Sequence, residues 1–186
     1  MLGRTKTTVV GAVVAAGALA FTGPALADQT QSTLSVTASV AQNCLISTNA
    51  VAFGAYDPVV TNSATGAALN GTGSVSVTCT RSSTGINITL GAGSNASGST
   101  RRMVGASTGA FLAYELYQPS ATTPAATCAF PGTTVWNAAS GTFTPSGIAD
   151  WGAAAPKSFN VCGTVPRGQD AAADSYTDSV IATITF

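Results

Sequence analysis

Residues 33–40 read Thr33-Leu34-Ser35-Val36-Thr37-Ala38-Ser39-Val40, and a cysteine, Cys44, follows them closely. Apolar and hydroxyl side chains alternate along the whole stretch, which is the period of two that is typical of a β-strand. The stretch contains no charge, glycine or proline, so nothing in it would interrupt a ladder of main-chain hydrogen bonds. These residues predict a strand, and they define the pattern to look for in the rest of the chain.

Short runs of the same kind recur after this stretch, separated by Gly, Ser, Asn and Pro. They are residues 51–56, 73–80, 85–90, 111–117, 158–165 and 176–186. The last run places four apolar side chains on one face, namely Val180, Ala182, Ile184 and Phe186. Short strands at this spacing predict an all-β fold in the form of an antiparallel sandwich.

Three stretches between these runs are expected to be loops, at residues 60–73, 91–100 and 119–147. The third is long for a loop, and we expect a small hairpin inside it, between residues 134–136 and 142–144. No repeat of fixed period is visible, so the pattern indicates one domain.

The first 27 residues have the layout of a cleavable export signal. Arg4 and Lys6 precede an apolar stretch at residues 9–21, and Ala25-Leu26-Ala27 forms a small-x-small cleavage site. The apolar stretch is too short to span a bilayer. We therefore predict a signal peptide at residues 1–27, an N-terminal extension at 28–42 and the folded domain at 43–186.

Four cysteines in an exported chain favour two disulfides in an oxidising compartment. They allow three pairings, and spacing alone does not choose among them. Cys44 shares strand parity with Val40, and Cys79 shares parity with Val77, so both thiols can point into one core. Parity therefore favours Cys44 with Cys79 and Cys128 with Cys162, although the sequence does not fix the pairing.

Catalytic motifs are weak in this chain, which has no histidine. Residues 105–109 match the Gly-x-Ser-x-Gly pattern of a nucleophile elbow, but a β-rich run follows where that motif needs a helix. Without histidine, no serine or cysteine triad can be assembled. The carboxylates show no spacing that singles out a catalytic pair. We expect a turn at residues 105–109, and a protein that is not an enzyme.

Patterns for binding nucleic acid, metals or cofactors are also lacking. Charged residues make up only 8% of the chain and form no basic stripe, so nucleic acid is not an expected partner. The lack of histidine and of any Cys-x-x-Cys pair argues against zinc, and no small-molecule cofactor is expected. Arg101 and Arg102 are interpreted as a solvated strand edge. Asp170, Asp174 and Asp178 are interpreted as solvated turn residues rather than a calcium loop.

The alternating segment at residues 33–40 has two interpretations that its pattern alone leaves open. It is the first strand of its own sandwich, or it is a donor strand that fills a groove in another molecule.

Several residue groups, taken together and in order, bear on this choice. They are Cys44-Leu45-Ile46, Phe53-Gly54-Ala55-Tyr56-Asp57-Pro58, Val77-Thr78-Cys79-Thr80, Arg102-Met103, Leu112-Ala113-Tyr114-Glu115-Leu116-Tyr117, Trp151-Gly152, Pro166-Arg167-Gly168-Gln169 and Tyr176-Thr177-Asp178. This series resembles the spore coat protein U domain family, which includes the pilins of archaic (Csu-type) chaperone–usher pili. The resemblance runs from about residue 34 to residue 186, and its chief departure is the enlarged stretch at 119–147.

The resemblance implies an immunoglobulin-like sandwich that lacks its final strand and is completed by donor-strand complementation. The donor residues would be Leu34, Val36, Ala38 and Val40, seated in the groove of the next subunit. The terminal strand, with its apolar face at residues 180–186, would contact a periplasmic chaperone. An outer-membrane usher would then replace the chaperone's strand with the N-terminal segment of the next subunit. The implied partners are thus identical or related pilins, a chaperone and an usher.

These inferences predict a structural pilin, exported through the periplasm to the cell surface, that serves attachment and biofilm formation. One alternative is a coat protein on a spore or cell surface. An alternative of another class is a secreted carbohydrate-binding module, in which residues 33–40 are its own first strand. Trp136, Trp151 and the tyrosines would then form the sugar platform, although core packing is the commoner use of such residues.

Overall fold

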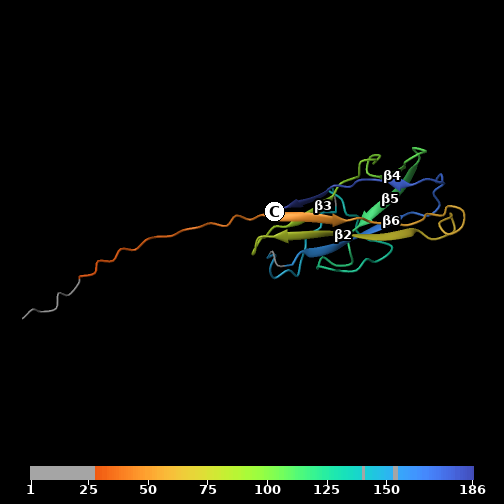
Figure 1. Cartoon of the computed structure of the whole chain (residues 1–186). Coiled ribbons are helices and arrows are strands. Elements are labelled where there is room, and N and C mark those ends of the chain that lie inside the picture. The colour runs from red at the N-terminus through yellow and green to blue at the C-terminus, as the bar shows by residue number, and fades with distance from the viewer. Residues whose placement is uncertain (1–27, 140, 153–154) are drawn as a thin grey trace, which may run out of the picture. The chain divides into compact units, whose positions relative to one another are not determined.

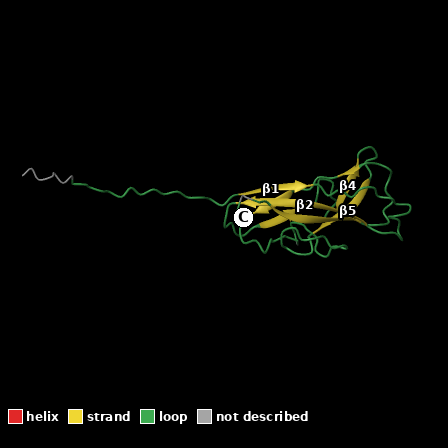
Figure 2. Ribbon diagram, turned by 60° about the horizontal axis from the view of Figure 1, so that its bottom comes forward, coloured by secondary structure: helices red, strands yellow, loops and turns green. Residues whose placement is uncertain are grey.

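The structure is a computed structural model that describes residues 28–139, 141–152 and 155–186. The signal peptide predicted at residues 1–27 lies outside these described residues. The described chain falls into two units, one ending at Ala38 and one running from Ser39 to Phe186. Within the described residues every regular element is a strand, and none is a helix long and apolar enough to cross a membrane (Figure 2).

All the strands belong to the second unit, and all pairings between them are antiparallel. They are β1 (Cys44–Asn49), β2 (Leu69–Cys79), β3 (Asn87–Leu90), β4 (Arg101–Gly105), β5 (Phe111–Tyr117), β6 (Lys157–Val165), β7 (Tyr176–Thr177) and β8 (Ala182–Thr185). The larger sheet has the order β1-β2-β6-β5-β4-β7, and the smaller sheet pairs β3 with β8 (Figure 1). The prediction of an all-β, immunoglobulin-like antiparallel sandwich is confirmed.

The central strands of the larger sheet supply most of the core. Alternate side chains of β2, β5 and β6 turn inward and are buried, as their period-two sequences predict. Val77, Phe159 and Val165 have no exposed surface at all. Burial of such side chains contributes roughly 1.5–3 kcal/mol each. The alternation read from the sequence therefore identifies the core face of the sheet.

Irregular chain covers the part of the core that the small sheet leaves open. Trp136 and Phe143, from the long loop at residues 119–147, stack with ring centroids 4.7 Å apart, and Phe143 meets Phe159 of β6 at 5.1 Å. The hairpin predicted inside this loop is wrong. Val135 instead bridges to Tyr117, and Phe143 bridges to Ile88, so each half of the expected hairpin pairs with the main fold.

The stretch at residues 51–56, predicted as a strand, is irregular and crosses the inner face of the larger sheet instead. Glycines make the crossing possible. Gly71 of β2 pairs in register with Gly163 of β6, and added Cβ atoms there would lie 2.6 Å from Val51 and 2.7 to 3.0 Å from the ring of Phe53. Val51 and Phe53 are partly buried against the sheet without a strand ladder. The alternation of apolar residues in this stretch therefore reflects contact with the sheet on one side and not a strand.

Other boundaries also differ from the prediction. Strand β1 was not among the predicted runs. Strand β2 begins at Leu69, inside a predicted loop, and the run at 176–186 is divided into β7 and β8. Strand β4, at the predicted solvated edge, forms a hairpin with β5.

Both disulfides join the cysteines that strand parity favoured. Cys44 is bonded to Cys79, which fastens the first residue of β1 to the last residue of β2. Cys128 is bonded to Cys162 and ties the long loop to the outer side of β6. Each bond closes a loop of about 35 residues, and chain-entropy arguments value such a closure at roughly 3–4 kcal/mol.

Candidate functional site: an open seam between two sheets

The candidate site is the gap between the edges of the two sheets. Strand β1 pairs only with β2, and β8 pairs only with β3, so each has one free edge within the described chain. Core-facing side chains along these edges, Ile46 on β1 and Ala182 and Ile184 on β8, are only half-buried. The core of the described chain is thus open along these two edges. Unpaired strand edges above exposed core are a template for pairing with another chain.

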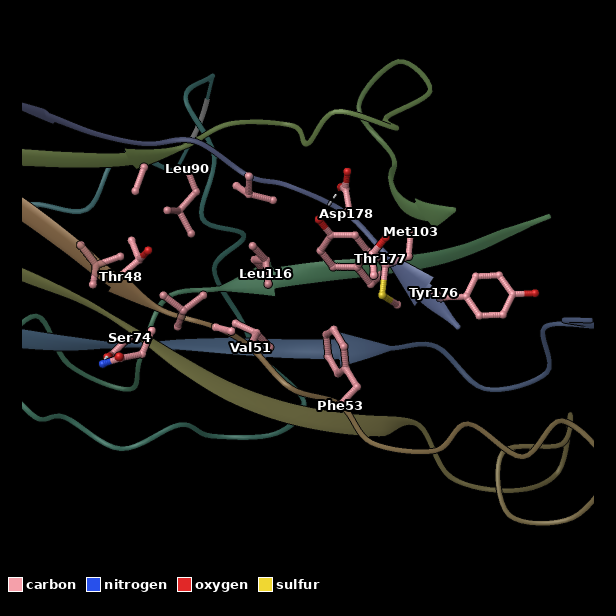
Figure 3. A pocket seen from close by; sticks show the side chains of 17 residues that line it. Thr48, Val51, Phe53, Ser74, Leu90, Met103, Leu116, Tyr176, Thr177 and Asp178 are labelled. Carbon is pink, nitrogen blue, oxygen red and sulfur yellow. Dashed lines mark hydrogen bonds between the residues drawn. The ribbon is translucent and has the colours of Figure 1, made fainter. Parts of the chain in front are cut away.

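A cavity of about 310 Å³ lies in the seam. Figure 3 shows Thr48, Val51 and Phe53 on one wall, Leu90 and Asp178 on the other, and Leu116 of β5 at the floor. A second hollow, of about 780 Å³, adjoins it and shares Val51, Phe53, Met103 and Tyr176 with it. We call the two together the seam groove.

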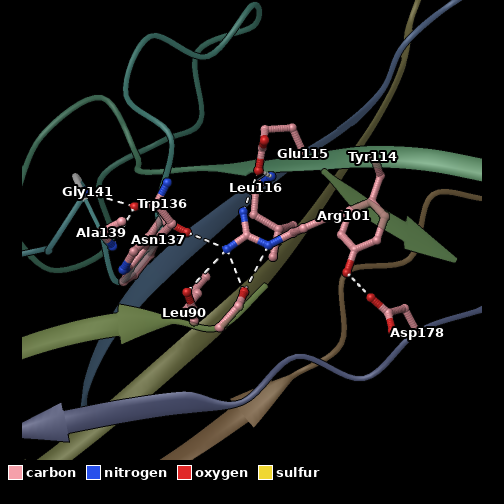
Figure 4. A network of polar contacts seen from close by, with 11 residues as sticks. Leu90, Arg101, Tyr114, Glu115, Leu116, Trp136, Asn137, Ala139, Gly141 and Asp178 are labelled. Carbon is pink, nitrogen blue, oxygen red and sulfur yellow. Dashed lines mark hydrogen bonds and ion pairs between the residues drawn. The ribbon is translucent and has the colours of Figure 1, made fainter. Parts of the chain in front are cut away.

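One wall of the seam groove is held in place by a polar network around Asp178. The Tyr114 hydroxyl donates to Asp178 Oδ2 at 2.7 Å (Figure 4). The main-chain and side-chain N–H groups of Asn95 donate to Oδ1 at 3.1 and 2.9 Å. Burial is the main reason why the pKa of Tyr114 is raised, and the hydrogen bond to Asp178 adds to it. The network fixes residues 178–181 between β7 and β8, so this wall is preformed.

Arg101 is buried next to this wall, which corrects its interpretation as a solvated edge residue. Its side chain is only 2% exposed. The guanidinium donates to the carbonyl oxygens of Leu90, Gly91 and Trp136 and forms an ion pair with Glu115 (Figure 4). Each of those carbonyls belongs to chain that leaves a strand or lies outside one. The guanidinium therefore satisfies main-chain groups that no ladder reaches.

The predicted aspartate turn is likewise structural rather than merely solvated. Asp174 accepts hydrogen bonds from the main-chain N–H groups of Ser107 and Thr108 at 2.9 and 2.7 Å, and from the Thr108 hydroxyl at 2.8 Å. These bonds, above all those from Thr108, lower the pKa of Asp174 well below its ordinary value of 3.8. Residues 105–109 form the expected turn between β4 and β5.

The two tryptophans lie in the core. Trp136 has no exposed surface and donates its indole N–H to the Ile88 carbonyl at 3.0 Å, and Trp151 is 7% exposed. They therefore provide no surface platform for a sugar. Within the described residues, no group of acidic, histidine or cysteine side chains is arranged to hold a metal ion.

The segment at residues 33–40, predicted as a strand, is irregular in this structure, and the predicted donor residues have no strand partner. The side chains of Leu34, Val36 and Val40 are 84 to 86% exposed, and Ala38 is exposed as well. Of the predicted chaperone-facing residues, Val180, Ala182 and Ile184 are half-buried on the seam, and Phe186 is about half exposed. Their roles in strand exchange stay predictions. Sequence reasoning missed the wall at residues 48–53, because its strand and its crossing segment were both misassigned.

The sequence model of the spore coat protein U domain matches residues 30–183, which is most of the chain. The chain belongs to the spore coat protein U domain family. It is 42% identical over 189 residues to Protein U of Myxococcus xanthus, covering 96% of this chain and 97% of that one. The resemblance stated from sequence motifs is confirmed.

A solved structure that is similar to this spore coat protein U domain chain is the CsuC–CsuE complex of a chaperone and a tip adhesion subunit. That complex comes from the archaic chaperone–usher Csu pili of Acinetobacter baumannii. The match has a TM-score of 0.43 and 18% identity, and covers 80% of this chain and 41% of that one.

Proposed function

We propose that this protein is a structural pilin subunit of an archaic chaperone–usher fimbrium that polymerises by donor-strand exchange. One combination of features carries the proposal. The chain has a seam groove with two free strand edges, and it also has an uncharged alternating segment, residues 33–40, whose apolar side chains are exposed. The groove has unpaired strand edges, and the segment has the alternation of a strand but no partner. Each is the chemical complement of the other.

The energetics of insertion favour a stable joint. A strand added along the free edge of β8 or of β1 would form main-chain hydrogen bonds with that edge, and these bonds do not depend on sequence. Burial of Leu34, Val36 and Val40 in the groove would contribute roughly 1.5–3 kcal/mol each before the cost of ordering the segment. The alternation sets the register, because a slip of one residue would turn hydroxyls into the groove.

Strand exchange of this kind produces an open polymer. The surface that gives the strand differs from the surface that receives it, so the contact is head-to-tail and does not close. The groove of each free subunit would need cover before assembly, because an exposed core edge promotes aggregation. We therefore infer a periplasmic chaperone that lends a strand and an outer-membrane usher that directs the exchange. Export to the cell surface, attachment and biofilm formation belong to the same proposal, which assigns no catalytic role.

The test compares two substitutions on opposite faces of the segment. Val36→Asp would place a charge in an apolar groove, and Thr37→Asp would place the same charge on the outward face of the same strand. We expect wild-type protein and Thr37→Asp to give ladders on unboiled detergent gels that collapse on heating. Val36→Asp should give monomers only. Equal ladders from both variants would remove residues 33–40 from the joint.

A constituent of a spore or cell-surface coat is a second candidate. The full-length similarity to Protein U, in a family named for a spore coat, favours it. Electron microscopy of labelled cells separates the two, because a pilin gives thin filaments and a coat protein gives a continuous layer. Genes for a chaperone and an usher beside this one would favour the filament. The carbohydrate-binding alternative loses both of its tryptophans as platform residues, because Trp136 and Trp151 are buried.

A further inference from the structure

The three residues that join the donor segment to β1 are held to the end of β2. The Thr80 main-chain N–H donates to the Asn43 carbonyl at 2.8 Å, which extends the β1–β2 ladder by one residue. The Thr80 hydroxyl accepts from the Asn43 N–H at 3.1 Å and lies 3.3 Å from the carbonyl oxygens of Ala41 and Asn43. Gln42 Nε2 donates to the Thr84 carbonyl at 2.9 Å. We call this set of bonds the Thr80 clamp.

The clamp matters because the donor segment has a competing site in its own molecule. Residues 41–43 have the length of a three-residue hairpin loop, which is a common connection between antiparallel strands. A hairpin closed there pairs Val40 with Cys44 and Ala38 with Ile46. Cys44 and Ile46 face the core, so their partners across the ladder would face it as well. The segment would then lie on the free edge of β1, in its own seam groove.

Such a fold-back would be strongly favoured by proximity. A strand tethered by three residues experiences an effective concentration of roughly millimolar or more at its own groove, whereas other subunits are present at far lower concentration. A chain of this design would cap itself and stop polymerising unless something prevented the turn.

The turn requires a backbone conformation that the clamp opposes. A three-residue hairpin loop places its last residue in the left-handed region, and asparagine at position 43 tolerates that region better than most residues. In this structure Asn43 is not left-handed: the non-glycine residues with positive φ among those described are Ser82 and Ala125. Both main-chain groups of Asn43 are bonded to Thr80, and rotation into the turn would break these bonds.

We propose that Thr80 is a positioning residue that keeps the leader from folding back, and so keeps the seam groove open for a second copy of the chain. This inference rests on the proposed strand exchange. The Thr80 clamp would determine whether residues 33–40 occupy the groove of their own subunit or that of the next one.

The test removes the hydroxyl of Thr80 and follows where the segment goes. Polymers with intact disulfides are dissociated in guanidinium and refolded at low micromolar concentration. A fluorescent peptide with the sequence of residues 32–41 then reports open grooves, and size-exclusion chromatography counts monomers. We expect Thr80→Val to raise the fraction of monomer that excludes the peptide about fivefold, the change that one net hydrogen bond gives. Thr78→Val, on the outer face of the same strand, is the matched control and should behave as wild type.

A rescue variant separates this role from a general effect on stability. Asn43→Val keeps the main-chain N–H but disfavours the left-handed conformation, because its side chain is β-branched. Added to Thr80→Val, it should restore polymers. Asn43→Gly alone should increase the closed monomer, since glycine adopts the turn freely.

Closed monomer in Thr80→Val, together with rescue by Asn43→Val, supports the inference. Equal polymer yields from Thr80→Val and Thr78→Val, with the wild type polymerising, overturn it and leave the proposed function intact. Loss of polymer without closed monomer or rescue also overturns it, because Thr80 would then act only on stability. A wild type that never polymerises overturns both proposals.

Discussion

Arg101 joins three stretches of chain through one guanidinium group, and this role could not be read from its neighbours in sequence. A pair of arginines beside a turn suggests solvent. The structure instead directs Arg101 inward, because its register partner Tyr114 faces the core, while Arg102 stays at the surface over the ring of Phe111. What the sequence does not display is that carbonyls from the distant loop need a donor at this point.

Replacement of Arg101 by Lys should therefore cost far more than the same change at Arg102. Lysine lacks the planar fork, so the carbonyls of Gly91 and Trp136 would lose donors in a buried site. We expect a loss of about 3 kcal/mol in the free energy of unfolding, against less than about 1 kcal/mol for Arg102→Lys. Guanidinium unfolding followed by tryptophan fluorescence measures both, in the same assembly state. Losses of equal size would refute the buried role.

At the level of elements, the strands that were predicted best are those whose side chains alternate between core and surface. Strands β2, β5 and β6 alternate because one face meets the core, and the sequence pattern located all three. The crossing segment at residues 51–56 also alternates, but it packs on Gly71 and Gly163 rather than pairing. Hydrophobic period reports burial on one side. It does not report ladder bonds, and this is why the segment was mistaken for a strand.

Gly71 should tolerate no side chain, since the crossing segment rests on it. An alanine Cβ there would lie 2.8 Å from the carbonyl oxygen of Ala52, which is main chain and cannot swing aside. We expect Gly71→Ala to lower the free energy of unfolding by about 1–3 kcal/mol. Gly91→Ala is the control, because its Cβ would come no closer than 3.5 Å to any atom of Ile181. Indistinguishable unfolding midpoints for the two variants would contradict the close packing.

On the scale of the whole molecule, the groove was the part that sequence could not locate. Its walls come from residues 48–53 and 171–182, which are far apart in the chain and meet only through the sheet order. The alternating segment at residues 33–40, by contrast, is local and visible in the sequence, and its role as a donor stays a prediction. Cysteine parity also worked, since Cys44 and Cys79 are register partners at the ends of adjacent strands.

The two disulfides should have separable effects on the assembled molecule. Replacing Cys128 and Cys162 by alanine removes the covalent tie of the long loop, and we expect the free energy of unfolding to fall by about 3 kcal/mol. Binding of the peptide of residues 32–41 should change little, because this bond lies on the outer side of β6. Replacing Cys44 and Cys79 should lower both the free energy of unfolding and the affinity for the peptide, because β1 forms a wall of the seam groove. Peptide titration beside guanidinium unfolding tests this, and a matching loss of binding in both variants would count against it.

Because β8 has a free edge, a donated strand would be hydrogen-bonded along its length to one subunit. Tension on a filament would then pull that strand along its own axis, in shear. All of its ladder bonds would share the load at the same moment, whereas a strand peeled from one end surrenders them one by one. The joint formed at the seam groove of each subunit would thereby become the strongest connection along the filament.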